Sequence, residues 1–160
     1  VRGTATTELV FDMAEYANDA IRHYLAMTKQ SQIRSYTTPY CPEGSLKEAD
    51  DESRGELAAS ACSFLMKGLW LARLARPGLP PGVCARACSI TKWSTNDDKR
   101  VARLVGYLQF SRNYKMVGRV CDDAKDLYLG LYVDADFCGD SGSTKSTSGG
   151  WLVLLGLKER

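Results

Sequence analysis

Residues 127–155 read LYLGLYVDADFCGDSGSTKSTSGGWLVLL, and this stretch decides the fold of the chain. From Leu127 to Val133, aliphatic side chains at odd positions alternate with Tyr, Gly and Tyr at even positions, a period of two that predicts a β-strand. Because both sets are largely apolar or aromatic, we expect the strand to be covered on both faces. A loop of Gly, Ser, Thr and Lys follows, and the apolar run from Trp151 to Leu155 predicts a second strand.

The first strand ends on two carboxylates, Asp134 and Asp136. A charged carboxylate at the end of a buried strand is costly unless it is paired or bound to a metal. Asp134 is therefore a candidate ligand of a hard divalent cation, which prefers oxygen donors. The alternative is that the two residues open a turn, where Asp accepts local hydrogen bonds. The spacing alone leaves both interpretations open.

The rest of the chain is mainly helical in its hydrophobic pattern. The predicted elements are an amphipathic helix over 10–28, a polar linker over 29–54, a helix from Ser53 to Arg76, a helix from Leu79 that ends near Lys92, a helix over 99–112 and a strand over 115–120. Ser53 and Glu56 have the spacing of a capping box. We expect the strand over 115–120 to form a hairpin with the strand at Leu127, giving the start of a three-stranded antiparallel sheet.

Residues 132–150, YVDADFCGDSGSTKSTSGG, resemble the opening of the ribonuclease H domain in the Pol polyproteins of copia-type LTR retrotransposons. That pattern runs aromatic, any residue, Asp-Ala-Asp-aromatic, small, Gly-Asp, a variable loop, and then Lys or Arg before Ser-Thr-Ser-Gly. The matching residues are Tyr132, Asp134, Ala135, Asp136, Phe137, Gly139, Asp140, Lys145, Ser146, Thr147, Ser148 and Gly149. Cys138 stands where the family usually has Ala. Residues 65–79 and 91–111 also resemble segments ahead of that domain, with Gly78 in place of the Asp of an Arg-Pro-Asp triplet.

The resemblance implies an α/β chain in which a helical connection segment precedes the truncated antiparallel start of a ribonuclease H-like sheet. It assigns the end of the reverse transcriptase and a linker to residues 1–52, the helical connection to 53–113 and the N-terminal part of the ribonuclease H-like domain to 114–160. In the intact protein, that domain degrades the RNA strand of RNA–DNA hybrids during reverse transcription, with Mg²⁺ as its cofactor. Asp134 corresponds to the first metal-binding carboxylate, and is the expected catalytic residue.

A two-metal centre needs several converging carboxylates. The family supplies a Glu and two further Asp residues from later elements, which this sequence does not contain, and the aromatic-any-Asp-Asp turn of the polymerase is missing as well. The resemblance therefore makes the chain part of an RNA-directed DNA polymerase and ribonuclease H polyprotein that we expect to be inactive alone. Val1 is not an initiator Met, so we expect a fragment or a processed product.

Two other functions are compatible with the residues. The first is a non-catalytic nucleic-acid-binding module, because cations on the outside of the predicted helix over 99–112 could follow a phosphate backbone. These cations are Lys99, Arg100, Arg103 and Arg112. Arg73 and Arg76 either stabilise the end of the helix that Pro77 ends or contact a nucleic-acid backbone. The second is a degenerate mobile-element remnant with no selected role.

Composition sets the remaining expectations. A net charge of +2 gives no strong electrostatic footprint for nucleic acid or membrane, and no apolar run approaches the roughly 20 residues of a membrane span. Without a signal-peptide pattern, we expect an intracellular protein, cytoplasmic or nuclear, whose six cysteines stay reduced with no disulfide partner. Cys84 and Cys88 could share a helix face, but zinc needs two further ligands and the only histidine, His23, is distant in sequence.

Overall fold

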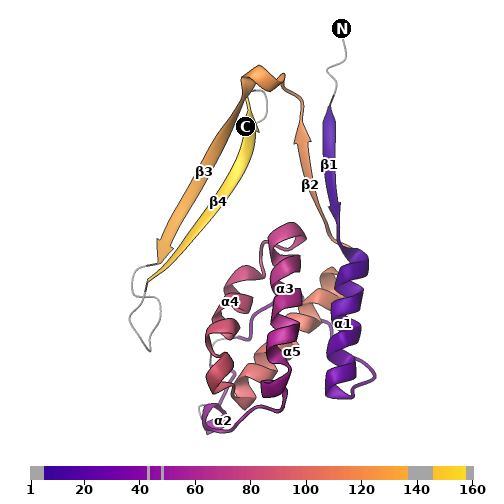
Figure 1. Cartoon of the computed structure of the whole chain (residues 1–160), viewed down its shortest axis with the longest axis vertical. Helices are drawn as coiled ribbons and strands as arrows, with labels where there is room; N and C mark the ends of the chain where they lie inside the picture. The colour runs from indigo at the N-terminus through magenta and orange to yellow at the C-terminus, as the bar shows by residue number, and fades with distance from the viewer. Residues whose placement is uncertain (1–5, 43, 48, 137–145, 158–160) are drawn as a thin grey trace. The chain divides into compact units, whose positions relative to one another are not determined.

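The chain divides into two units, each described here by itself. One unit runs from Val10 to Met116, and the other combines Val1–Leu9 with Val117–Arg160. The computed structural model of the protein describes residues 6–42, 44–47, 49–136 and 146–157. Over these residues the protein is a mixed α/β chain with two two-stranded antiparallel sheets, which confirms the predicted α/β class (Figure 1).

The unit from Val10 to Met116 is mostly helical. Its elements are α1 (Ala14–Thr28), α2 (Ala49–Glu52), the 3₁₀ helix η1 (Glu56–Ala59), α3 (Ala61–Ala75), α4 (Pro80–Cys88), the 3₁₀ helix η2 (Ile90–Lys92) and α5 (Thr95–Ser111). The strands and the remaining 3₁₀ helix are β1 (Thr7–Asp12), β2 (Lys115–Val120), η3 (Ala124–Asp126), β3 (Leu127–Asp136) and β4 (Thr147–Gly156).

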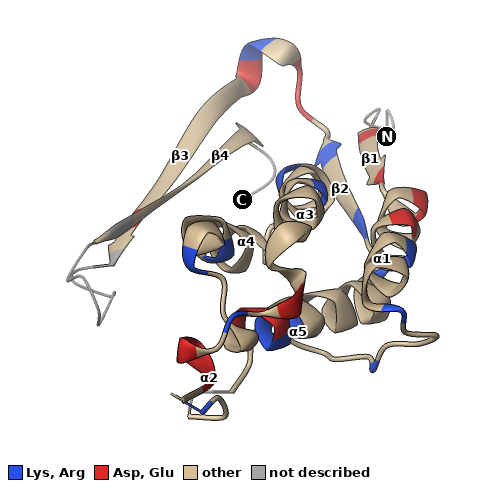
Figure 2. Ribbon diagram, turned by 60° about the horizontal axis from the view of Figure 1, so that its bottom comes forward, with Lys and Arg blue, Asp and Glu red and all other residues tan. Residues whose placement is uncertain are grey.

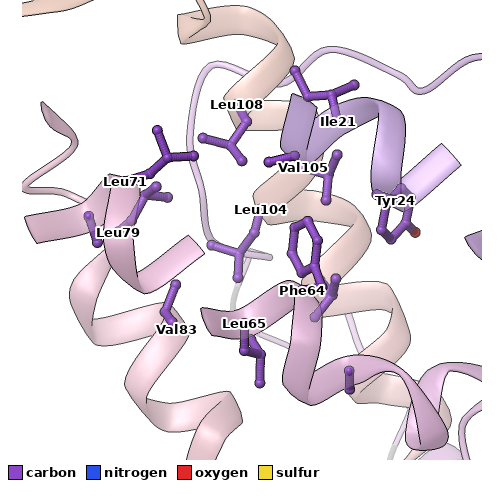
Figure 3. Close-up of a cluster of buried hydrophobic side chains, with 14 of the residues drawn as sticks. Ile21, Tyr24, Phe64, Leu65, Leu71, Leu79, Val83, Leu104, Val105 and Leu108 are labelled. Carbon is purple, nitrogen blue, oxygen red and sulfur yellow. The ribbon is translucent and has the colours of Figure 1, made fainter. Parts of the chain in front are cut away.

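The hydrophobic core lies among α1, α3, α4 and α5 (Figure 3). On α5, apolar residues at intervals of three and four face inward as the sequence predicts, namely Val101, Leu104, Val105 and Leu108. The rings of Tyr24 on α1 and Phe64 on α3 meet edge to face, with centroids 5.7 Å apart. Full burial of one such side chain contributes about 1.5–3 kcal/mol. This shared core, more than helix propensity, therefore stabilises the helices.

The first element of the chain differs from the prediction. The helix expected over 10–28 begins at Ala14, and Thr7–Asp12 form the strand β1, which pairs with β2. The two strands run in opposite directions (Figure 1). The Asp12 carboxylate accepts a hydrogen bond from the backbone N–H of Ala14 at 3.1 Å and pairs with Lys115 at 2.7 Å. The predicted hairpin of the 115–120 strand with the strand at Leu127 is therefore wrong, because β1 is the partner of β2.

The helix predicted from Ser53 to Arg76 is divided into η1 and α3, and the predicted capping box of Ser53 with Glu56 does not form. The backbone carbonyl of Ser53 instead accepts from the N–H of Thr95 at 2.9 Å. The N–H groups that begin η1 are bound by the carboxylate of Asp98, which lies 2.6 Å from the nitrogen of Glu56. A tertiary contact thus replaces the local cap that the sequence indicates.

A capping box does form at the start of α5, between Ser94 and Asp97. The Ser94 hydroxyl accepts from the Asp97 N–H at 3.2 Å, and the Asp97 carboxylate accepts from the Ser94 N–H at 3.0 Å. This box starts α5 at Thr95, four residues before the predicted start at Lys99. The helix predicted from Leu79 is likewise shorter, since α4 ends at Cys88 and a separate 3₁₀ turn reaches Lys92.

The polar linker lies along α5. We call its residues 34–42 and 44–47, together with α2, the strap. The N–H of Tyr36 donates to the carbonyl of Gly106 at 3.0 Å, and the side-chain amide of Asn96 donates to the carbonyl of Lys47 at 2.8 Å. A Cβ atom at Gly106 would overlap the Tyr36 ring and the Arg34 carbonyl. The close approach of strap and helix therefore requires glycine at this position.

Candidate functional site

The stretch that carries the Asp-Ala-Asp sequence forms an antiparallel hairpin of β3 and β4. Its register runs from Leu127 opposite Gly156 to Asp136 opposite Thr147. Both predicted strands are confirmed, and the second begins at Thr147 rather than at Trp151. Residues 137–145, which include the predicted motif positions Phe137, Gly139, Asp140 and Lys145 as well as Cys138, lie outside the described residues.

The hairpin has two chemically different faces, because side chains alternate along each strand. We call the one with the odd-numbered residues of β3 the aliphatic face, and it contains Leu127, Leu129, Leu131, Val133, Leu152 and Leu154. We call the other one the aromatic face, and it contains Tyr128, Tyr132, Asp134, Trp151, Val153 and Leu155. Asp134 and Asp136 are the only charged residues of the two strands, so Figure 2 shows the hairpin almost entirely in tan.

Within the described residues of its own unit, the hairpin has exposed side chains on both faces. Leu129 and Val133 on the aliphatic face are 69% and 74% exposed, and Tyr132 on the aromatic face is 61% exposed. The described residues of this unit therefore do not provide the expected cover on both faces of the strand. The physical reason is that a two-stranded sheet without a packed layer leaves both of its surfaces in water.

Asp134 lies in β3 on the aromatic face, directly opposite Gly149. Its side chain is exposed, so the argument that a buried carboxylate needs a metal does not apply to it. Among the described residues, no group of three or more His, Cys, Asp and Glu side chains could hold a metal ion. One exposed carboxylate does not match the set of converging oxygens that a two-metal centre needs, so the described residues alone do not fit Mg²⁺. The role of Asp134 as a metal ligand stays a prediction.

Three of the four candidate nucleic-acid contacts bind the strap or the start of α5. Lys99 pairs with Asp50, and Arg100 lies 3.8 Å from Asp51 and 3.2 Å from Asp97. The blue cations of α5 and the red carboxylates of α2 are visible together in Figure 2. These charges are already partly neutralised inside the chain, which reduces what they can offer to a phosphate backbone.

Arg103 binds the strap through hydrogen bonds and ring stacking. Its guanidinium donates to the carbonyl of Thr38 at 3.0 Å and to the hydroxyl of Thr38 at 2.7 Å. The same group stacks over the ring of Tyr36, 4.0 Å from the centroid. Arg112 is exposed, and its backbone carbonyl accepts a hydrogen bond from Arg76. Binding of nucleic acid by these cations stays a prediction.

Arg76 is a buried structural residue, so its predicted contact with a nucleic-acid backbone is wrong. It is only 3% exposed, and its guanidinium donates to the carbonyls of Ala75 and Ser111 at 2.8 Å and of Arg112 at 3.1 Å. Burial lowers the pKa of this guanidinium. Because the carbonyls of Ser111 and Arg112 are at the negative end of α5, Arg76 ties the ends of α3 and α5 together.

Sequence reasoning missed two carboxylates at the start of α5. The Asp98 carboxylate accepts hydrogen bonds from the N–H groups of Glu56 and Leu57 and from the indole of Trp93, at 2.6, 3.2 and 2.7 Å. Asp97 pairs with Arg86 of α4. Burial alone would raise the pKa of the Asp97 carboxyl, but the Ser94 N–H and the Arg86 charge lower it overall. The only sequence signal was their place just ahead of the helix predicted over 99–112, which indicates a helix start but not these distant partners.

Comparisons with known proteins give no match: no family model, curated protein or solved structure is similar to this chain. In the described part of the chain, every helix is too short or too polar to cross a membrane. None of the described cysteines is in a disulfide.

Proposed function

We propose that the chain is part of a copia-type Pol polyprotein, from the end of the reverse transcriptase to the start of the ribonuclease H domain. In this proposal, the hairpin of β3 and β4 is the first part of a ribonuclease H-like sheet. Asp134 is the first carboxylate ligand of the Mg²⁺ centre that cleaves the RNA strand of an RNA–DNA hybrid. The sequence motif of residues 132–150 is the basis of the proposal.

The single observation that best supports the proposal is the register of the hairpin. The two ends of the motif are separated in sequence by the loop, yet they pair residue by residue across the strands. Asp134 lies opposite Gly149, and Ala135 lies opposite Ser148. Tyr132 and Trp151 form the next pair on the same face as Asp134. This pairing places the Asp134 side chain on the aromatic face of the hairpin, beside the Tyr132–Trp151 pair.

The exposed hairpin supports a place within a larger domain. A sheet is stable when at least one face packs against another layer, and both faces of this hairpin are apolar over most of their length. In the intact polyprotein, further elements would cover these faces and supply the missing carboxylates. We therefore expect the isolated chain to have no nuclease activity, because one carboxylate cannot hold two metal ions.

The test compares this chain with a longer protein, in which the reading frame is extended past Arg160 into the downstream coding sequence. Each is incubated with a labelled RNA–DNA hybrid and Mg²⁺, and cleavage is followed on a gel. We expect no cleavage by the chain alone, and cleavage by the longer protein that Asp134→Asn abolishes. Asp123→Asn is the matched control, because Asp123 is exposed and makes no side-chain cap.

Two results would overturn the proposal. The first is cleavage by the isolated chain that Asp134→Asn abolishes, since this would mean that the described residues suffice. The second is cleavage by the longer protein at an equal rate with and without the Asp134 carboxylate. Loss of cleavage in the Asp123→Asn control would count against a specific role for Asp134.

A further inference from the structure

Helix α4 carries two cysteines one turn apart. Cys84 and Cys88 both lie within the helix, both are exposed and neither is in a disulfide. Residues four apart share one face of a helix, with Cβ atoms about 5–6 Å from each other. The two thiols are therefore neighbours on the surface of the helical unit, and none of the contacts proposed above uses them.

The packing of α4 explains why these thiols face solvent. Val83 is buried and Ala87 is partly buried against the hydrophobic core, so this pair defines the inner stripe of the helix. Each residue of an α-helix turns the chain by about 100°. Cys84 and Cys88 each follow one member of the inner stripe and therefore lie beside it, on an outer flank. A Cβ atom built on Gly68 of α3 would lie 3.4 Å from Val83, so this turn of α4 packs close to α3.

The spacing fits a bound ion better than a disulfide or zinc. A disulfide needs Cβ atoms about 3.5–4.5 Å apart, which is closer than helical spacing provides. A structural zinc needs four ligands, and no described group of three or more suitable side chains exists. If the metal–sulfur bonds are about as long as the 2.3 Å of zinc–thiolate bonds, a linear complex separates its two sulfurs by about 4.6 Å. Thiols on Cβ atoms about 5–6 Å apart reach that separation without distorting the helix.

We propose that Cys84 and Cys88 form a two-thiolate site for a soft monovalent metal ion, with Cu(I) as the ligand. Thiolates are the ligands that select Cu(I) over harder ions. Each thiol releases one proton to solvent as its sulfur binds, so one Cu(I) and two thiols give an anionic bis-thiolate complex and two protons. The copper remains Cu(I), and no electron is transferred. The reduced state of exposed thiols inside cells keeps both ligands available.

The test uses the full chain, reduced and free of oxygen, in competition with a coloured Cu(I) chelator. We expect the chain to withdraw Cu(I) from the chelator, and Cys84→Ser and Cys88→Ser each to weaken binding about 100-fold or more, because the second thiol acts at a high effective concentration. Cys62→Ser is the matched control, since Cys62 is an exposed cysteine on α3.

A second measurement on the unsubstituted chain does not depend on how the variants fold. Alkylation of each cysteine is followed by mass spectrometry with and without Cu(I). We expect Cu(I) to slow the alkylation of Cys84 and Cys88 about 10-fold or more, because a thiol reacts only while the metal ion is not bound to it. The alkylation rate of Cys62 should be unchanged. Equal protection of Cys62, no protection of the α4 pair, or unchanged binding by either α4 variant would overturn the proposal.

Discussion

Replacing Asp98 with Ala should destabilise the helical unit more than any ordinary surface substitution. The Asp98 carboxylate accepts hydrogen bonds from Leu57 and Glu56 of η1 and from the indole N–H of Trp93, which is only 4% exposed. The Glu56 N–H is exposed and can bind water instead. The other two donors lose their partner in a part-buried place, at about 1–3 kcal/mol each. We therefore expect Asp98→Ala to lower the free energy of unfolding by about 3 kcal/mol.

Urea unfolding followed by far-UV circular dichroism measures this loss. With a slope of about 2 kcal/mol per molar urea, a loss of about 3 kcal/mol lowers the midpoint by about 1.5 M. Asp98→Asn keeps one acceptor oxygen and should lose roughly half as much. Asp123→Ala is the control, because the side chain of Asp123 makes no cap hydrogen bond. It should leave the free energy of unfolding within about 0.5 kcal/mol of that of the parent protein.

A double-mutant cycle with Trp93→Phe tests whether the indole hydrogen bond is the reason. Phe removes the N–H donor, so Asp98→Ala should cost about 1 kcal/mol less in the Trp93→Phe background than in the parent protein. Strictly additive effects of the two substitutions, or a loss of less than about 1 kcal/mol for Asp98→Ala alone, would refute the assignment of Asp98 as the link between η1, Trp93 and α5.

Three further predictions concern other contacts of the helical unit. The pKa of the Asp97 carboxyl is lowered from 3.8 in the folded protein. Its contribution to stability is therefore present above that value and is lost as the pH falls below it. On acidification, the urea midpoint of Asp97→Asn should decline less steeply than that of the parent protein. Arg76→Met should cost about 3 kcal/mol in urea unfolding, because carbonyls at the end of α5 lose a buried donor. Gly106→Ala should displace the strap and speed amide exchange at Tyr36, whereas Gly118→Ala, where a Cβ meets nothing within 4 Å, should not.

The sequence predicts elements well where one local pattern determines them. Apolar residues at helical intervals identify the buried stripes of α1 and α5, and strict alternation identifies β3. β1 was missed because its Leu9 and Val10 are both exposed, and it is held by pairing with a distant strand. No periodicity within six residues reports such a partner.

The candidate site shows the same limit. The capping box predicted from Ser53 and Glu56 does not form, because Asp98 already binds the start of η1, and the structure has a capping box at Ser94 instead. The sequence predicts that the cations of α5 form a basic surface facing solvent. In the structure, Lys99 and Arg103 bind the strap, whose residues lie about 50 or more positions earlier in the chain. Periodicity gives the face of a helix, but it does not give the segment that returns to cover that face.

The pairing of β1 with β2 links the order of synthesis to the order of folding. The hydroxyl of Thr6 and the sulfur of Cys121 lie 3.3 Å apart although 115 residues separate them. At about 5–20 residues per second, a ribosome needs roughly ten seconds to make the second strand after the first. A tag, a cleavage or a truncation at the start of the chain would therefore affect the sheet of β1 and β2, which can form only after α5 has been translated.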